Sequence, residues 1–160
     1  MTRFRSGAGL VLALVAGLVL AGPVAAGDPV PFKGGFAGTD LGRPIPNTPF
    51  ASVIVEAEGN STQLGRFAYT AQITVNTATG VGSGTFVFTA ANGDTVYGTV
   101  SGRAAFTPPN VLSIAETATI TGGTGRFAGA TGGFDVARLK DTVTGETAAS
   151  FEGAISFPGR

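Results

Sequence analysis

Apolar and polar residues alternate with a period of two along most of the chain after residue 30. No stretch there has the 3.6-residue period of an amphipathic helix. The clearest run is 63–76, where one face carries Phe67, Tyr69, Ala71, Ile73 and Val75. Similar runs occupy 32–38, 50–58, 84–91, 95–104, 111–121, 132–140 and 147–157. The pattern predicts eight β-strands in an all-β domain.

Turn signals separate these runs. Asn92-Gly93-Asp94 predicts a hairpin with a type I′ turn, because Asn and Gly tolerate positive φ. The proline-rich stretch 44–49 predicts a rim loop, and Pro108-Pro109-Asn110 separates the fifth and sixth strands because proline lacks a backbone donor. Short connections predict antiparallel neighbours. Eight such strands favour a closed up-and-down β-barrel, which has no free edge, over a two-sheet sandwich.

A glycine-rich segment connects the sixth and seventh strands. Its sequence is Gly122-Gly123-Thr124-Gly125-Arg126-Phe127-Ala128-Gly129-Ala130-Thr131-Gly132. Gly123, Gly125 and Ala128 have the spacing of a dinucleotide-binding fingerprint, but that motif needs a following helix, and the glycines after Ala128 leave no room for one. The segment therefore predicts a compact corner in which Phe127 is the apolar anchor.

This corner resembles the "GGTG-x-F-x-x-A-x-G" corner of allene oxide cyclase and dirigent barrels and of small secreted bacterial relatives. The segments 59–67 and 88–94 resemble two further blocks of those bacterial proteins, and in spacing and order the likeness extends over 32–157. It implies a calycin-like, eight-stranded barrel, which is often trimeric in the plant members. No position allows a cyclase or dirigent catalytic set to be carried over to this chain.

The first 26 residues have the pattern of a secretory signal peptide. Arg3 and Arg5 precede an apolar run over 9–22, and small residues follow up to Ala26. We expect cleavage after Ala26, a single barrel domain over 27–160, and Sec-dependent export to the periplasm, the cell envelope or the medium. The apolar run is shorter than the roughly 20 residues that span a bilayer, so we expect no integral membrane segment after cleavage.

Composition narrows the function classes. Without Arg3 and Arg5, eight basic residues stand against ten acidic ones, a net charge of −2, so nucleic acid is not an expected partner. The chain has no Cys and no His, which removes disulfides, the usual transition-metal ligands and Ser-His-Asp or Cys-His catalysis. We expect no metal and no cofactor.

Charged residues at apolar-face positions are the candidate site. Glu116 shares the apolar face of the sixth strand, and Arg138 shares that of the seventh. A symmetric hairpin that places Thr121 opposite Gly133 would put Glu116 opposite Arg138, and we expect these two to form an ion pair in or near the lumen. The pair could merely fix the strand register, or Arg138 could bind an anionic head group and Glu116 could act as a general base.

Aromatic residues could line a ligand pocket or simply fill the barrel. Tyr69 is a candidate phenolic donor, whereas Phe86 and Phe88 are candidate pocket residues on one face of the fourth strand. Phe151 and Phe157 share a face of the last strand, and Glu56 and Glu58 extend toward solvent or the barrel mouth.

The sequence thus favours a non-catalytic module that binds a small, mainly apolar molecule or a partner. Alternatives are an allene oxide cyclase-like isomerase with Glu116 or Tyr69 as the polarising group, a dirigent-like guide of radical coupling, and a structural surface protein. The pattern leaves a homo-oligomer open, and it identifies neither the ligand nor the biological process.

Overall fold

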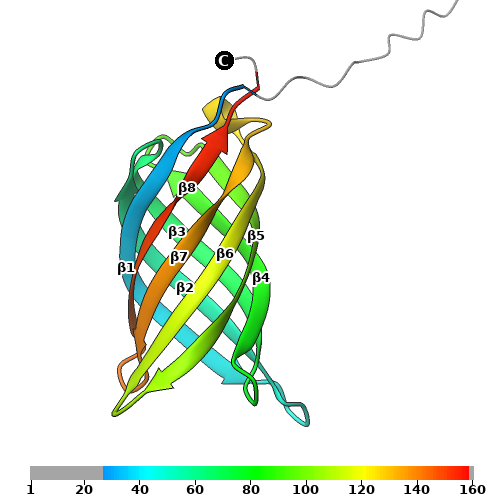
Figure 1. Cartoon of the computed structure of the whole chain (residues 1–160), viewed down its shortest axis with the longest axis vertical. Coiled ribbons are helices and arrows are strands. Elements are labelled where there is room, and N and C mark those ends of the chain that lie inside the picture. The colour runs from blue at the N-terminus through cyan, green and yellow to red at the C-terminus, as the bar shows by residue number, and fades with distance from the viewer. Residues whose placement is uncertain (1–26, 159–160) are drawn as a thin grey trace, which may run out of the picture.

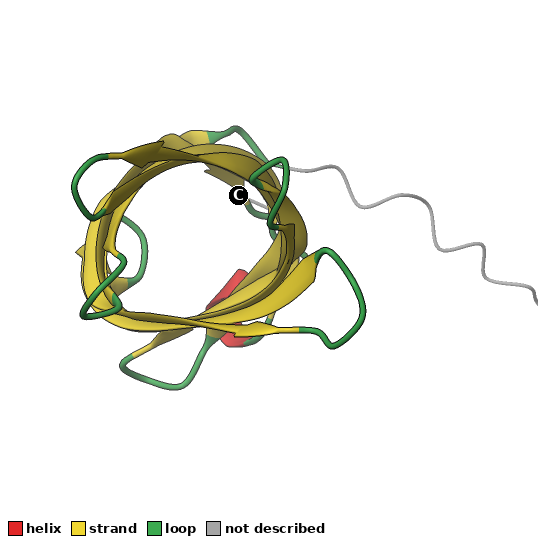
Figure 2. Ribbon diagram, turned by 90° about the horizontal axis from the view of Figure 1, so that it is seen from below, coloured by secondary structure: helices red, strands yellow, loops and turns green. Residues whose placement is uncertain are grey.

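The computed structural model describes residues 27–158, so the expected signal peptide lies outside the described residues. Eight antiparallel strands form one closed barrel in sequence order (Figures 1 and 2). They are β1 (Val30–Pro44), β2 (Phe50–Ser61), β3 (Gly65–Asn76), β4 (Val81–Ala90), β5 (Thr95–Thr107), β6 (Val111–Gly123), β7 (Thr131–Asp141) and β8 (Glu146–Ser156). The predicted all-β, up-and-down barrel is confirmed.

Closure depends on the pairing of the first strand with the last. β1 pairs with β2 on one side and with β8 on the other, from Val30 opposite Ile155 to Thr39 opposite Glu146. β1 runs to Pro44, well beyond the predicted 32–38, because it pairs with β2 as far as Pro44 opposite Ala51. Apolar alternation is hidden there because glycines occupy several inward positions: Gly34, Gly38 and Gly42.

The barrel has two distinct ends. The first and last described residues and the connections 62–64, 91–94 and 124–130 lie at one end, here called the terminal end (Figure 1). The connections 45–49, 77–80, 108–110 and 142–145 lie at the other, here called the distal end. The proline-rich stretch forms a distal connection after β1 ends at Pro44, close to the prediction.

Aromatic side chains fill the terminal half of the lumen. Phe88 is fully buried, and neighbouring rings have centroids 4.9 to 5.8 Å from its own. These rings belong to Phe32, Phe67, Tyr69, Phe86, Phe134 and Phe151. Edge-on and tilted packing of this kind lets large rings fill a narrow cylinder with little void.

The glycine corner seals the terminal end. It contains a short 3₁₀ helix, η1 (Gly125–Phe127), and Phe127 is buried with its ring centroid 5.9 Å from that of Phe157. Gly125 has positive φ, and a Cβ there would lie 1.9 Å from the Asp94 carboxylate, so only glycine fits. The predicted compact corner with its Phe127 anchor is confirmed.

The turn at Asn92 differs from the prediction. Gly93 has positive φ, but Asn47 is the one non-glycine residue with positive φ in the part of the chain that the structure describes. The turn is therefore not type I′. Asn92 Oδ1 instead accepts a hydrogen bond from the Asp94 amide, and the Ala90 amide donates to the Asp94 carbonyl oxygen. Asn92 thus stabilises the turn through its side chain.

The aromatic core gives a direct stability test. Phe88→Ala should lower the free energy of unfolding by about 3–5 kcal/mol, because it removes a ring from the centre of the packed half. Val87→Ala is the matched control on the same strand, since Val87 faces outward and is 38% exposed. It should change stability by about 0.5 kcal/mol or less. Urea unfolding measures both, and equal losses would contradict this account of the core.

Candidate functional site

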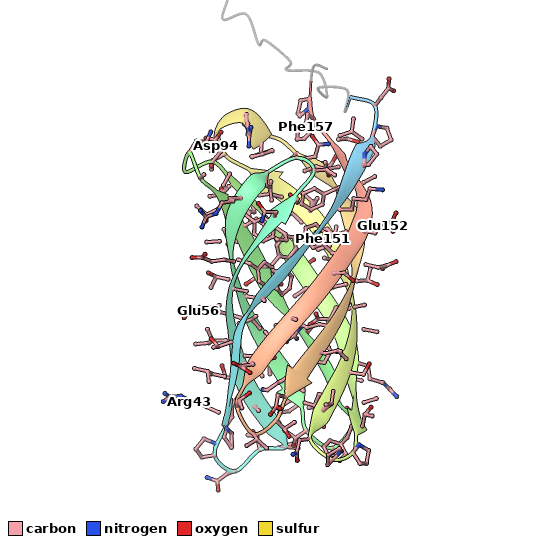
Figure 3. All side chains as sticks on the ribbon, turned by 90° about the vertical axis from the view of Figure 1, so that its left-hand side faces the viewer. Arg43, Glu56, Asp94, Phe151, Glu152 and Phe157 are labelled. Atoms are coloured by element: carbon pink, nitrogen blue, oxygen red, sulfur yellow. The ribbon has the colours of Figure 1, made fainter. Side chains whose placement is uncertain are left out.

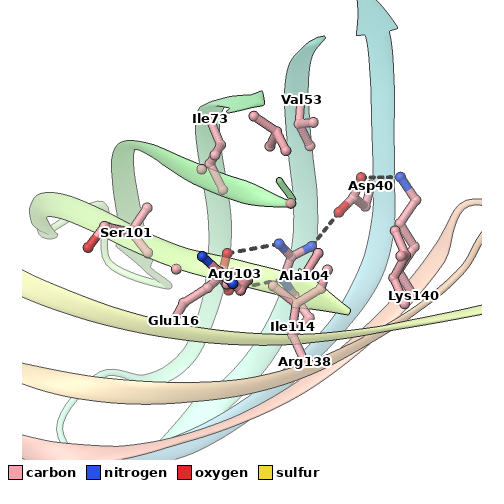
Figure 4. Close-up of a pocket in the computed structure, with 16 residues that line it drawn as sticks. Asp40, Val53, Ile73, Ser101, Arg103, Ala104, Ile114, Glu116, Arg138 and Lys140 are labelled. Atoms are coloured by element: carbon pink, nitrogen blue, oxygen red, sulfur yellow. Dashed lines mark hydrogen bonds and ion pairs between the residues drawn. The ribbon is translucent and has the colours of Figure 1, made fainter. Parts of the chain in front are cut away.

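A buried ionic network crosses the distal half of the lumen, where the aromatic rings end. It joins Asp40 of β1, Glu116 of β6, and Arg138 and Lys140 of β7; we call it the ionic cluster (Figure 4). The Asp40, Glu116 and Arg138 side chains are 3–7% exposed, and that of Lys140 is 15% exposed. Its charges sum to zero, because two carboxylates face two cations.

Arg138 is the centre of the cluster. Its Nε donates to Glu116 Oε2 at 3.1 Å, and its Nη2 donates to Glu116 Oε1 at 2.9 Å. Its Nη1 donates to Asp40 Oδ2, and Lys140 Nζ donates to Asp40 Oδ1. The planar guanidinium therefore holds one carboxylate in a bidentate fork and a second carboxylate beside it.

The predicted ion pair forms, but the predicted register is wrong by two residues. Glu116 lies opposite Val136, and Arg138 lies opposite Ile114. The corner is not a symmetric hairpin, because the last residues of β6 pair with β5 past an irregularity near Tyr97 and Gly98. A two-residue shift keeps every side chain on its face, so Glu116 and Arg138 meet diagonally.

Burial and pairing affect the titration of two groups. Although burial alone would lower the pKa of Arg138, its hydrogen bonds and charge interactions with Glu116 and Asp40 raise it. Burial, and secondarily the Glu116 charge, raise the pKa of Tyr69 well above its ordinary value, against a smaller lowering by Arg138. The Tyr69 phenol therefore stays protonated, and it interacts electrostatically with both Glu116 and Arg138.

A small cavity of about 90 Å³ lies beside the ionic cluster. One wall carries the four cluster residues, and the opposite wall is aliphatic (Figure 4). Val53, Ile73 and Val75 of β2 and β3 lie across the cavity from Arg138, whereas Leu112 and Ile114 lie on β6 beside Glu116 and Arg138. The cavity lies toward the distal end, because its lining includes Gly80 and Gly82 next to the β3–β4 connection.

The other sequence candidates lie elsewhere. Phe86 and Phe88 belong to the packed terminal half, and Phe151 and Phe157 are labelled in that half in Figure 3. Tyr69 stacks on Phe36 with ring centroids 4.5 Å apart, at the border between the rings and the ionic cluster. Of the named ligand candidates, Glu116 and Arg138 line the cavity, whereas Tyr69, Phe86 and Phe88 do not.

Two cluster members were missed from the sequence. Asp40 lies beyond the predicted end of the first strand, and glycines at 38 and 42 hide its inward face. Lys140 lies inside the predicted seventh strand with the parity of Phe134, Val136 and Arg138, so its face could have been assigned. Glu56 and Glu58 are exposed on the outer wall, as one of the two predicted alternatives stated.

Among solved structures, the chain is similar to the structure of the pterocarpan synthase dirigent protein GePTS1. The TM-score is 0.59 at 14% sequence identity, and the match covers 94% of this chain and 99% of that chain. No family model matches the chain, and no curated protein matches it. The predicted likeness to a dirigent-type barrel is thus confirmed at the level of the fold.

Alkaline pH tests the burial of Tyr69. An unfolded tyrosine loses its proton near pH 10, whereas the folded phenol keeps it, so folding stability should fall as pH rises above about 10. The expected slope from this group is about 1.4 kcal/mol per pH unit. Tyr69→Phe should remove that slope in denaturant titrations. The control is Tyr97→Phe, since the only other tyrosine is 41% exposed, and an unchanged slope in Tyr69→Phe would contradict the assignment.

Removal of the Arg138 charge tests the ionic cluster. Arg138→Met leaves two buried carboxylates without their main partner and should cost about 3–5 kcal/mol of unfolding free energy. Arg66→Met is the control, because Arg66 pairs with Glu58 at 3.6 Å with both side chains 78% exposed, and it should cost about 1 kcal/mol or less. Adding Glu116→Gln to Arg138→Met should recover stability, because it leaves the balanced pair of Asp40 and Lys140. A double variant less stable than Arg138→Met would contradict the charge explanation.

Proposed function

We propose that this protein is an exported, non-catalytic binding module for a small, neutral, mainly apolar molecule, which it holds at the distal end of its barrel. The observation that carries the proposal is the distal cavity, which has an aliphatic wall opposite a charge-balanced ionic cluster. Sites of this kind use an apolar body for affinity and a few polar groups for orientation.

The ionic cluster favours a neutral ligand. Its two carboxylates already balance its two cations, so a charged ligand beside these buried groups would leave an uncompensated charge in a low-dielectric site. Arg103, the fifth charged residue of the cavity lining, is exposed and lies at the mouth side of the cavity rather than in the buried cluster. Arg138 uses three of its five N–H donors on Glu116 and Asp40, which leaves N–H donors for a ligand oxygen. A neutral carbonyl, hydroxyl or ether oxygen adds no charge and can accept a hydrogen bond from Arg138.

The cavity volume sets the size of the ligand. About 90 Å³ is less than the roughly 300 Å³ of ordinary ligand pockets, and also less than the roughly 150 Å³ of an engineered cavity that binds benzene. The ligand is therefore a small molecule, or the apolar end of a longer one that projects from the distal mouth.

The cyclase alternative receives less support. A general base needs a free carboxylate, but both Glu116 oxygens accept hydrogen bonds from Arg138. Tyr69 lies outside the cavity lining. A dirigent-like guide of radical coupling is the second candidate, because the fold is shared with a dirigent protein. A changed stereochemistry of products when the protein is added to oxidase-generated phenoxy radicals would favour that candidate.

Three probes with one ring test the proposal: cyclopentanone, cyclopentanecarboxylate and cyclopentylammonium. The neutral ketone should bind with a Kd of about millimolar order, which suits its few heavy atoms, and both ions should bind more weakly. Backbone amide shifts in NMR should change at Gly82 and Gly102, which line the cavity. Native mass spectrometry of protein from a secreting host should show a retained neutral ligand.

Gly42→Leu provides a blocking variant. A Cβ at Gly42 would contact Val53 Cγ2 at 3.7 Å and no other atom within 4 Å, so a larger side chain fits there beside the cavity wall. It should abolish ketone binding, whereas Thr39→Leu, on the outward face of the same strand, should not. Preference for either ion, or equal ketone binding by Gly42→Leu, would contradict the proposal.

A further inference from the structure

Large apolar side chains in and near the connections are buried at the terminal end of the barrel and exposed at the distal end. At the terminal end, Leu64 and Phe127 lie in the connections and are buried, at 3% and 2% exposure. At the distal end, each of the four connections carries an exposed large apolar side chain or has one within two residues of it. We call this set the apolar rim: Ile45, Phe50, Val81, Phe106 and Val143.

The exposure of the apolar rim is substantial. Val143 is 73% exposed at the tip of the β7–β8 connection, and Phe106 is 59% exposed at the end of β5. Just behind the rim, the outer wall adds further exposed side chains: Leu41, Ile54 and Leu139. A concentration of exposed apolar side chains at one end of a molecule is typical of a contact with a membrane or another protein.

The rim lies in one layer around the cavity end. The four distal connections project together from the same end of the cylinder (Figures 1 and 2). A flat, deformable surface can therefore contact all four at once, although their side chains are separated around a ring. Phenylalanine side chains at such positions insert readily into the boundary between head groups and acyl chains.

Charge adds a second, independent reason for a lipid surface. Arg43 and Arg103 are exposed just behind the rim, and within residues 27–158 neither forms an ion pair; Arg43 is labelled at this end in Figure 3. At the terminal end, Arg66 and Arg126 do pair, with Glu58 and Asp94. Because these guanidinium groups lie just behind the apolar rim, they are placed to bind lipid phosphates when the rim contacts a membrane.

The remaining charges orient the barrel. The terminal half has an excess of acids over bases: Asp28, Glu58, Asp94, Asp135 and Glu152 against Lys33, Arg66 and Arg126. In the distal half, Asp141 and Glu146 offset Arg43 and Arg103 and the ionic cluster is neutral, while Glu56 lies in the middle of β2 near mid-height of the barrel (Figure 3). An anionic membrane would therefore repel the terminal half more than the distal half.

We propose that the apolar rim docks the barrel end-on onto a phospholipid surface, with Arg43 and Arg103 in contact with head-group phosphates. Docking places the distal cavity against the bilayer, from which a small apolar molecule could enter without crossing water. The docking does not depend on the proposed ligand, so the docking proposal and the ligand proposal can be contradicted separately.

Vesicle flotation tests the docking. The protein should float with vesicles of phosphatidylcholine, and more so with an equal mixture of phosphatidylcholine and phosphatidylglycerol. Phe106→Ser with Val143→Ser should lower the bound-to-free ratio about tenfold or more. The matched control is Val87→Ser with Tyr97→Ser, two exposed apolar residues of the terminal half, and it should bind as the unchanged protein does.

A charge series tests the arginines. Arg43→Gln with Arg103→Gln should remove the preference for phosphatidylglycerol, whereas Arg66→Gln should keep it. All variants are compared both in the full chain and in a chain that begins at Gly27. The second form contains the whole barrel and lacks the apolar run 9–22, which could bind vesicles by itself.

A fluorescence reporter locates the contact. The chain has no tryptophan, so Phe106→Trp and Tyr97→Trp each give a single-tryptophan protein. Emission of the first should shift to the blue on vesicles, and emission of the second should not. Thermal unfolding confirms that each variant is folded.

Three results would overturn the proposal. The protein that begins at Gly27 could stay unbound with both vesicle types. The rim variant could float as well as its control. Analytical ultracentrifugation could show that the rim variant loses self-association while flotation stays unchanged, in which case a second copy of the chain covers the rim.

Discussion

The pairing of β1 with β8 is the constraint on which the rest of the molecule depends. It converts an eight-stranded sheet with two free edges into a cylinder, and it thereby fixes which side chain of every alternating pair is enclosed. A cylinder of eight strands is just wide enough to be filled by side chains or to hold one small ligand. The lumen is therefore either filled or left with a small space. In this structure the terminal half is filled, and the distal half contains the small cavity.

The two halves fill the lumen by different physical means. Packed rings around Phe88 gain from apolar burial and from edge-on contacts. In the distal half, Asp40, Glu116 and Arg138 satisfy one another, so their burial is tolerated because each charge has a partner. The hydrogen bonds of the ionic cluster fix the directions of its side chains, so these side chains fill space less freely than aliphatic ones do. A small cavity lies beside them.

Strand number and most inward faces followed from alternation, because a period of two assigns a face without knowledge of the neighbour, and antiparallel order followed from the short connections. The Glu116–Arg138 pair was accessible for the same reason: a two-residue error in register keeps both side chains inside. Asp40 was not accessible, because its strand is rich in inward glycines that carry no apolar signal. Its partner Arg138 is 98 residues away, and only closure through β8 brings the two together.

Closure of a barrel does not require its two ends to differ, yet the two ends of this barrel differ in the burial of apolar side chains, in the pairing of arginines and in net charge. The terminal end is sealed by Phe127 and Phe157, has its arginines paired and carries an acidic excess. The distal end has exposed Phe106 and Val143, the cavity, and two arginines that form no ion pair within residues 27–158. Exposed apolar side chains are costly to solubility, and no packing demand of the fold places them at all four distal connections. Their concentration around the cavity end connects the two proposals: a site for an apolar molecule is most useful where the molecule can reach it from an apolar phase.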